Sequence, residues 1–239
     1  MGFAHIENGR ETWGACSSVP RHRHDQAYAA LVLAGSYEES GSRGRLRVGP
    51  GDVLLHRRFD AHRDRFGERG AQIVNILLCG TEVSAFAVGR VRDADTIART
   101  AESDPLQAGL EMKAQLNEAC RGAGDWPDAL ARDLLDDPDI RLADWAGRHD
   151  LAAETVSRGF SKVFGLTPAA FRTESRAHRA FVLIAGTSIP LAWVAAETGF
   201  SDQAHMSRAV AGLTGAPPSH WRRSIPFKTG GQSSCQIAP

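Results

Sequence analysis

The chain has 239 residues, and its hydrophobic content of 42% suffices for one large or two modest cores. It carries 28 Lys and Arg against 28 Asp and Glu, a balance that by itself argues against a nucleic-acid-binding protein. The charge is uneven, however. Residues 1–137 hold 17 basic against 21 acidic side chains, net −4, whereas residues 138–239 hold 11 against 7, net +4. Only the second part has the sign expected of a surface that faces phosphates.

The sequence shows no sign of a membrane or secreted class. No stretch approaches about 18 consecutive apolar residues, and residues 1–13 are too polar for a signal peptide. The four cysteines are dispersed without metal-binding spacing: Cys16, Cys79, Cys120 and Cys235. We therefore expect reduced thiols in a cytoplasmic protein.

Residues 1–90 have the pattern of strands and turns. Short apolar or alternating runs are separated by stretches rich in Gly, Ser, Asp and Arg; the runs are Tyr28–Leu33, Arg45–Val48, Asp52–His56 and Gln72–Leu78. Gly49-Pro50-Gly51-Asp52 predicts a tight turn between two of them. This pattern predicts a small antiparallel β-barrel.

Histidines flank this turn, as His22-Arg23-His24 before it and His62 after it. With these motifs, residues 15–80 resemble a cupin barrel. In metal-binding cupins a His-x-His pair, a Glu and a later His converge inside the barrel, which implies a divalent metal on His22, His24 and His62. Tyr28 or Ala29 stands at the Glu position, so the carboxylate is missing.

Three readings of these histidines stay open. Three imidazoles can still hold zinc with an open position, assisted by His56 or Asp25. Alternatively, His22 and His24 line a mouth of the barrel or bond neighbouring loops. In the third reading a small anionic or polar effector is bound by His22, His24, Tyr28 and His62. Because alternate residues of a strand share a face, we expect the three histidines to converge on one interior site that serves binding rather than turnover.

Residues 91–137 predict a helical connector. Leu106–Cys120 and Trp126–Leu135 read as helices, the first with an apolar stripe of Leu106, Leu110 and Ala114. Such a pair resembles a dimerisation arm, or it covers one face of the barrel. Asp137-Pro138 marks the expected domain boundary.

The last third of the chain repeats itself at an offset of 50 residues. Ser157-Arg158-Gly159-Phe160 returns as Ser207-Arg208-Ala209-Val210, and residues 165–172 return as 215–222 with a Gly-x-x-Pro start in both. Upstream, Trp145-Ala146 returns as Val194-Ala195 at an offset of 49. A repeat of this length indicates one small helical module that is used twice.

Each copy predicts a helix-turn-helix. Gly199 suits a sharp turn and Ser201 suits an N-cap, whereas the first copy has Asp150 and Ala152 at these positions. The second helices are expected over 153–164 and 202–213. Their inward residues would be Val156, Phe160 and Val163, then Met206, Val210 and Leu213. A helix over 169–185, opened by Thr167 and Pro168, would join the modules, with an apolar face that includes Val182.

With Gly199-Phe200-Ser201-Asp202-Gln203 and His205-Met206-Ser207-Arg208, residues 140–223 closely resemble the paired helix-turn-helix domain of the AraC/XylS family of bacterial transcription regulators. Many members place a cupin sensor before it. The resemblance implies these DNA-binding residues: Glu154, Ser157, Arg158, Gln203, Ala204, His205 and Arg208, with Arg222 on phosphate. Gly159 stands where the family has a large apolar residue, so we expect a looser first module and a smaller role for Arg158 than for Arg208.

The sequence thus predicts an α+β protein. Its parts are a cupin-like sensor barrel (1–90), a helical connector (91–137), a double helix-turn-helix (138–225) and a disordered tail (226–239). The predicted function is a non-enzymatic, sequence-specific transcription regulator. Its expected partners are double-stranded promoter DNA, RNA polymerase, a small effector and a second copy of the chain. The alternatives are a metal-dependent cupin enzyme, and a constitutive DNA binder whose barrel is a scaffold.

Overall fold

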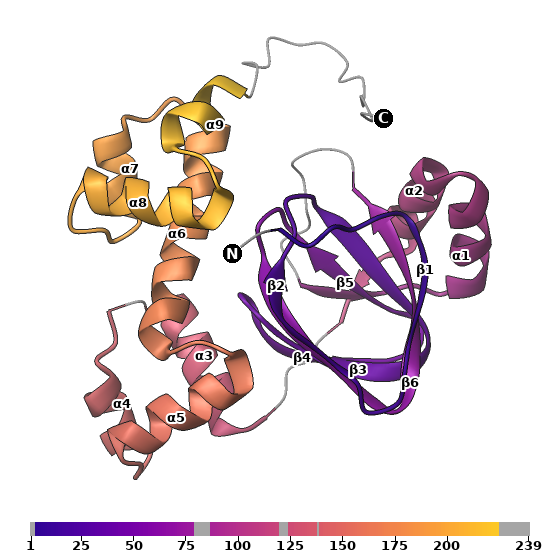
Figure 1. Cartoon of the computed structure of the whole chain (residues 1–239), viewed down its shortest axis with the longest axis horizontal. Coiled ribbons are helices and arrows are strands. Elements are labelled where there is room, and N and C mark those ends of the chain that lie inside the picture. Colours follow the sequence, from indigo (N-terminus) through magenta and orange to yellow (C-terminus); the bar gives the residue numbers. More distant parts are fainter. Residues whose placement is uncertain (1–2, 79–86, 120–123, 138, 225–239) are drawn as a thin grey trace. The chain divides into compact units, whose positions relative to one another are not determined.

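The computed structural model describes residues 3–78, 87–119, 124–137 and 139–224 (Figure 1). The tail predicted over 226–239 and three of the four cysteines lie outside these residues, whereas Cys16 is exposed and free. The chain divides into two compact units, Met1–Arg172 and Thr173–Pro239. Within the described ranges, no helix combines the length and the apolar character needed to cross a membrane.

The first unit contains an antiparallel sheet. Its described strands are β1 (Gly9–Trp13), β2 (Ser18–Arg23), β3 (Tyr28–Gly41), β4 (Gly44–Val48), β5 (Asp52–His56), β6 (Ala61–Leu77), β7 (Val88–Arg90) and β8 (Asn117–Glu118). The strand order is β1-β6-β3-β5-β7-β8, with β2 paired to β6 and β4 paired to β3. The predicted closed barrel is wrong, because among the described strands no pairing joins the two ends of this order.

The two faces of the sheet are covered differently. Helices α1 (Ala94–Ser103) and α2 (Pro105–Gln115) pack on one face, where Ile97 and Met112 join a core with strand residues such as Leu31 and Ile76. The apolar residues predicted to line one side of α2 do not pack on the sheet. Leu106 and Leu110 are 59% and 57% exposed, and Ala114 is also exposed. The opposite face carries a second core, which includes Tyr28, Val32, Tyr37 and Phe66.

Two irregularities interrupt the pairing of the long strands β3 and β6. They lie between Val32 and Ala34 and between Gly35 and Tyr37. Gly35 has φ 71°, and a Cβ on it would lie 2.0 Å from the carbonyl oxygen of Gly70. No side chain fits there. The irregularities change which residues of β3 face inward, and this decides the composition of the site described below.

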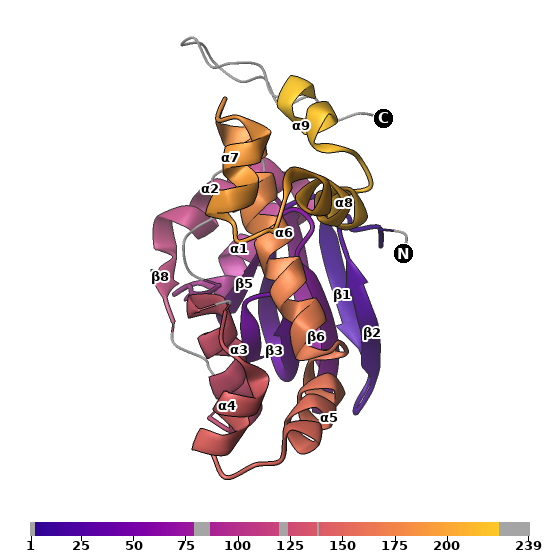
Figure 2. The ribbon, with the colours of Figure 1, turned by 90° about the vertical axis from the view of Figure 1, so that its left-hand side faces the viewer.

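Four helices form a separate core in the first unit (Figure 2). They are α3 (Trp126–Asp136), α4 (Leu142–Arg148), α5 (Ala153–Phe164) and the beginning of α6 (Pro168–Gly186). The core residues are Leu130, Ala131, Leu134, Trp145, Ala146, Val156, Phe160, Phe164 and Phe171. Phe164 is buried, whereas Val163, which was predicted to face inward, is only half-buried. Helix α3, predicted as part of the connector, thus packs in the first helix-turn-helix module.

The second unit consists of the rest of α6 with α7 (Leu191–Glu197), α8 (Gln203–Thr214) and α9 (Pro218–Ser224). Met206, Val210 and Leu213 of α8 are buried, as the sequence predicts. Val182 of α6 is 51% exposed, so its predicted place on the apolar face is wrong; Ile184 is buried instead. The expected cap of α6 is confirmed, because the Thr167 hydroxyl accepts a hydrogen bond from the Ala170 amide at 3.2 Å.

Candidate DNA-reading helices and histidine cluster

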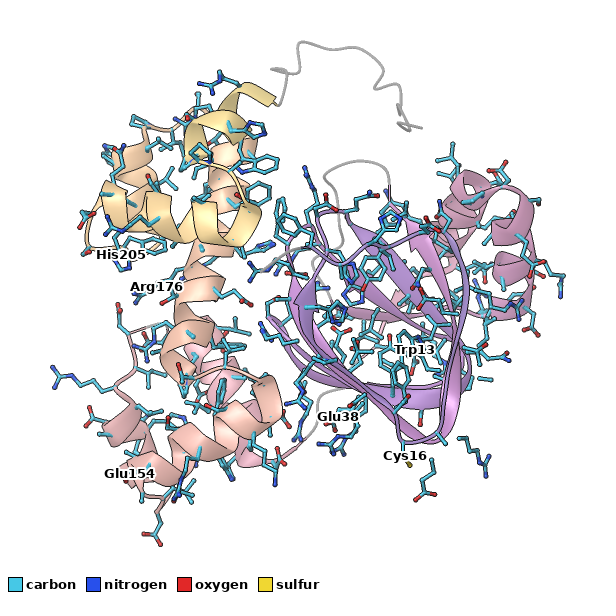
Figure 3. The ribbon with its side chains drawn as sticks, in the orientation of Figure 1. Trp13, Cys16, Glu38, Glu154, Arg176 and His205 are labelled. Atoms are coloured by element: carbon cyan, nitrogen blue, oxygen red, sulfur yellow. The ribbon has the colours of Figure 1, made fainter. Side chains whose placement is uncertain are left out.

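Helix α5 presents a polar surface at its N-terminal half. Glu154 and Arg158 are exposed, and Ser157 between them is half-buried. Figure 3 shows Glu154 pointing away from the helices of its module. The buried residues Val156 and Phe160 hold the opposite side of the helix. The predicted base-facing residues of this module therefore share one accessible surface.

Helix α8 repeats this arrangement. Gln203, Ala204 and Arg208 are exposed, and His205 is half-buried with its ring edge-on to Phe200. The predicted cap at Ser201 is wrong, because the Asp202 carboxylate accepts from the His205 amide at 2.7 Å. Ser201 donates to that carboxylate.

The turns of the two modules have the same backbone conformation. Gly199 has φ 75°, and Asp150 at the equivalent position has φ 54°. Asp is one of the few residues besides glycine that tolerates this region. The first turn therefore forms without glycine.

Arg222 and its repeat counterpart Arg172 have inward-facing contacts. Arg222 Nη2 donates to the carbonyl oxygen of Ile189 at 2.5 Å, and Arg172 Nη2 donates to that of Ile140 at 2.7 Å. Each arginine thereby joins the last helix of its module to a residue two positions before the start of α4 or α7. This gives Arg222 a structural contact that the predicted phosphate role did not include.

Gly159 is in contact with an aromatic ring. A Cβ on Gly159 would lie 2.5 Å from Cζ2 and 2.6 Å from Cη2 of Trp126. The indole of α3 thus fills the space that the family's large apolar residue would occupy. The expectation of a looser first module rested on the helix-propensity cost of this glycine, and the contact with Trp126 opposes that cost.

The sheet brings His22, His24 and His62 together. The ring centroids lie 4.2 Å apart for His22 and His62, 4.9 Å for His22 and His24, and 5.6 Å for His24 and His62. His24 and His62 are buried, and His22 is half-buried. Tyr28 joins the cluster through a contact of 3.2 Å between its hydroxyl and His62 Nε2, whereas Ala29 lies in the core of the opposite face.

Glu39 and His56 complete the cluster. Glu39 Oε2 lies 3.4 Å from His56 Nε2 and 3.3 Å from His62 Nδ1, and all three side chains are buried. His56 stacks on Tyr28 at 4.2 Å, whereas Asp25 is exposed. Glu39 is thus a buried carboxylate beside His56 and His62, in a set of possible ligand atoms separate from that of His22, His24 and His62. Sequence reasoning overlooked it because residues 28 and 39 of a regular strand would face opposite sides.

The protonation of the cluster differs from ring to ring. Burial and the charge of His62 lower the pKa of His24 to about 4, and burial holds the pKa of His56 well below its usual value. Burial also disfavours the charge on His62, but Glu39 and Asp64 outweigh it and raise the pKa of His62 to about 9. One imidazolium therefore sits among neutral rings near neutral pH.

The donor set fits a divalent transition metal. One ring nitrogen from each of His22, His24 and His62 lies within 4.8 Å of the others. Each Nδ1 has an oxygen partner, namely Pro20 O, Ala4 O and the Asp64 carboxylate, at 2.9, 2.9 and 3.0 Å. Metal-binding histidines show this pattern, because the bond at one nitrogen orients the other toward the ion. One ligand atom from each of Glu39, His56 and His62 also lies within 4.8 Å of the others, beside a cavity of about 10 Å³, the size of one water molecule.

A family model described as a helix-turn-helix domain matches residues 145–224. The arabinose operon regulatory protein of Escherichia coli (strain K12) is 26% identical over 163 residues, which are 68% of this chain and 53% of that protein. Its Salmonella typhimurium counterpart is 29% identical over 111 residues, 46% of this chain and 37% of that protein. The chain is thus similar to AraC-type regulators, with a helix-turn-helix domain over residues 145–224. It spans about half or less of the curated relatives it matches.

Solved structures resemble this chain remotely. Unsaturated fatty acid-bound ToxT from Vibrio cholerae is 11% identical, with a TM-score of 0.42, and the match covers 93% of this chain and 98% of that one. The DNA-binding domain of AdpA, in complex with a target DNA, is 18% identical with a TM-score of 0.39, over 42% and 93% of the two chains. Likenesses this remote carry no functional detail.

Proposed function

We propose that this chain is a sequence-specific transcription regulator that binds promoter DNA through α5 and α8. The observation that carries the proposal is the repeat of one polar surface in two modules, with Arg158 and Arg208 exposed at equivalent positions. The match to a helix-turn-helix domain and the similarity to arabinose operon regulatory proteins support it and argue against a metal-dependent cupin enzyme. The net charge of +4 over residues 138–239 has the sign that attraction to phosphates requires.

The chemistry of the exposed set suits base edges in the major groove. An arginine can pair bidentately with guanine O6 and N7, a glutamine with adenine, and a glutamate with the cytosine amino group. Arg158 and Arg208 are thus assigned to guanine, Gln203 to adenine and Glu154 to cytosine. Ser157, Ala204 and His205 would make the smaller contacts around them.

The experiment is selection of duplexes from a random library by the full-length protein, followed by gel-shift assays at several salt concentrations. We expect one enriched sequence and an affinity that falls steeply with salt, because phosphate contacts release counterions. A protein that enriches no sequence is not a sequence-specific regulator. The full chain is needed, because a cut at residue 137 would remove α3 from the first module's core.

We further propose that the histidine cluster makes the sheet a sensor domain. The ligand is a divalent transition metal held by His22, His24 and His62, or a small polar effector that bonds the same rings and Tyr28. The neutral state of His22 and His24 and the oxygen partners of all three Nδ1 atoms favour the metal. A bound ion would supply a positive charge and fix the relative positions of the rings. Its affinity should rise with pH, since the His62 proton competes with it.

Calorimetric titration with ZnCl₂ tests this site, with His24→Ala as the variant that removes a ligand and His5→Ala as a control on an exposed histidine. Binding that is lost only in His24→Ala supports the metal. If no metal binds, and no ligand library shifts the melting temperature, the alternative of a constitutive DNA binder with a scaffold sheet holds.

Homodimerisation is proposed through α2, whose Leu106 and Leu110 are exposed at helical spacing. Analytical ultracentrifugation of wild type and Leu106→Glu/Leu110→Glu tests it. RNA polymerase is proposed as a partner at the promoter, and a pull-down with the DNA-bound full chain tests that contact.

A further inference from the structure

Two arginines of the sheet hold the C-terminal end of helix α5. Arg21 Nη1, in β2, donates to the carbonyl oxygen of Phe164 at 3.1 Å, and Arg63 Nη1, in β6, donates to that of Lys162 at 2.8 Å. The helix ends at Phe164 and is capped by Gly165, where a Cβ would lie 3.6 Å from atoms of both arginine side chains. All these residues belong to the first compact unit.

These contacts suit the end of a helix. The last four carbonyl groups of an α-helix have no partner within the helix, and the C-terminal end of the helix dipole attracts positive charge. Lys162 and Phe164 contribute two of these four carbonyl groups. The position of α5 is therefore set by the sheet at one end, while its other half carries Glu154 and Arg158.

The same strands carry the histidine cluster. Arg21 directly precedes His22, Arg63 directly follows His62, and His22 and His62 are paired opposite each other across β2 and β6. Successive side chains of a strand point to opposite faces. The histidines point into the cluster while the adjacent arginines reach α5. A displacement of either strand at the cluster thus moves an arginine that bonds the helix, with no residue in between.

A third arginine makes a different contact. Arg45 of β4 has a side chain that is 8% exposed, and it bonds both carboxylate oxygens of Asp128 at 2.9 and 2.8 Å and also contacts Asp125. Both aspartates lie at the beginning of α3, the helix that packs on Gly159 of α5 through Trp126. Strand β4 contributes no histidine to the cluster. Arg45 therefore anchors the helical module to the sheet independently of the cluster.

We propose that Arg21 and Arg63 are positioning residues that transmit the state of the histidine cluster to the DNA-reading helix α5, while the Arg45–Asp128 pair is the fixed anchor. The inference rests on the proposed function for its biological meaning. It describes how that site is regulated. A ligand at the cluster changes the hydrogen bonds that β2 and β6 donate to the last turn of α5, and thereby shifts the population of the DNA-reading arrangement.

The test is amide hydrogen exchange of the full-length protein, read in a peptide that covers the last turn of α5. The cluster is perturbed in two ways, by ZnCl₂ and by His22→Ala. The variants are Arg21→Gln, Arg63→Gln and the double variant. Arg65→Gln is the matched control, because Arg65 is an exposed arginine of β6 two residues from Arg63. Far-ultraviolet circular dichroism and melting temperature verify the fold of each variant, and the single variants serve if the double variant does not fold.

We expect the last turn of α5 to exchange about five- to tenfold faster in Arg21→Gln/Arg63→Gln, as loss of helix-end bonds predicts. In wild type and Arg65→Gln, at least one perturbation of the cluster should change exchange there severalfold. In the double variant this response should disappear, and Asp128→Asn should leave it intact while lowering the melting temperature. The proposal is overturned if the response is equal with and without the two arginines, or if neither perturbation changes exchange in wild type. This readout uses no DNA, so a failure to bind DNA would contradict the proposed function alone.

Discussion

The indole of Trp126 occupies the space beside Gly159, so that helices α3 and α5 are in direct contact there. The AraC/XylS family, which the sequence resembles, has a large side chain at this position. The ring is also near Trp145, with centroids 6.3 Å apart, in the core of the module. The glycine is therefore a packing partner for a ring from another helix rather than a weak point.

Replacing this glycine should destabilise the protein. In a free helix Gly→Ala stabilises by about 1 kcal/mol, but here the added methyl group would overlap Trp126, and overpacking costs about 1–3 kcal/mol. We expect Gly159→Ala to unfold at lower denaturant concentration, with a changed tryptophan emission. The control is Ala209→Gly at the equivalent position of α8, which should lose about 1 kcal/mol from helix propensity. A gain in stability for Gly159→Ala would show that Trp126 does not fill this space.

The two exposed arginines should contribute comparably to base reading. Because Trp126 packs against Gly159, we now expect Arg158 to contribute about as much as Arg208. Arg158→Ala and Arg208→Ala should each cost about 1–3 kcal/mol at the selected site and flatten the preference at one base position. Base-preference profiles on randomised duplexes measure this, with the exposed Arg179→Ala on α6 as control. Unchanged profiles in both variants would remove these side chains from the reading surface.

Arg222→Ala should lower the stability of the protein and leave its electrostatic attraction to DNA unchanged. Its guanidinium bonds the Ile189 carbonyl oxygen, and losing a bond of a charged donor costs about 1.5–3 kcal/mol. We expect a lower melting temperature and an unchanged slope of log affinity against log salt. A slope reduced by about one, at unchanged melting temperature, would instead identify Arg222 as a phosphate contact.

Acid should remove the contribution of the buried neutral His24 to the stability of the metal-free protein. The pKa of His24 falls from 6.5 in the unfolded chain to about 4 in the folded one, so between these values the unfolded state binds more protons. The contribution of this ring is therefore fully present above pH 6.5 and declines as the pH falls toward 4, by about 2 kcal/mol at pH 5. His56, whose pKa is also lowered, adds to the decline, whereas His62 and Glu39, whose pKa values are raised to about 9 and about 8, oppose it because the folded state binds their protons more tightly. Chemical denaturation in chelator at pH 7.5 and 5 is therefore compared between wild type and His24→Gln. The free energy of unfolding of wild type relative to His24→Gln should fall by about 2 kcal/mol between the two pH values. An equal pH dependence of the two proteins would show that His24 is not buried in its neutral form.

The sequence predicts the helical modules well because their signals are local. Spacing alone places Met206, Val210 and Leu213 inside, and α5 has the predicted limits of residues 153 and 164. Predictions from spacing fail where a partner far away in the sequence determines which side of a helix is buried. Leu106 and Leu110 follow a helical period, yet α2 packs on the sheet through Ala108 and Met112, because a short helix offers apolar residues on two sides.

The histidine cluster was predictable only in part. The His-x-His pair and His62 can be recognised from their motif, but Glu39 enters through irregularities of β3 that no sequence period encodes. Helix α3 was assigned to the connector for a similar reason. Its place beside α5 depends on Trp126 meeting Gly159, two residues that are 33 positions apart.

Base-preference profiling of the full-length chain tests the central claim most directly, because it asks whether two repeated helices read duplex sequence. The protein is incubated with a random duplex library, and bound sequences are compared for wild type, Arg158→Ala and Arg208→Ala. We expect one enriched motif with two conserved parts, one for each helix, and the loss of one part in each variant. Enrichment of no sequence, or of one that neither substitution alters, would contradict it.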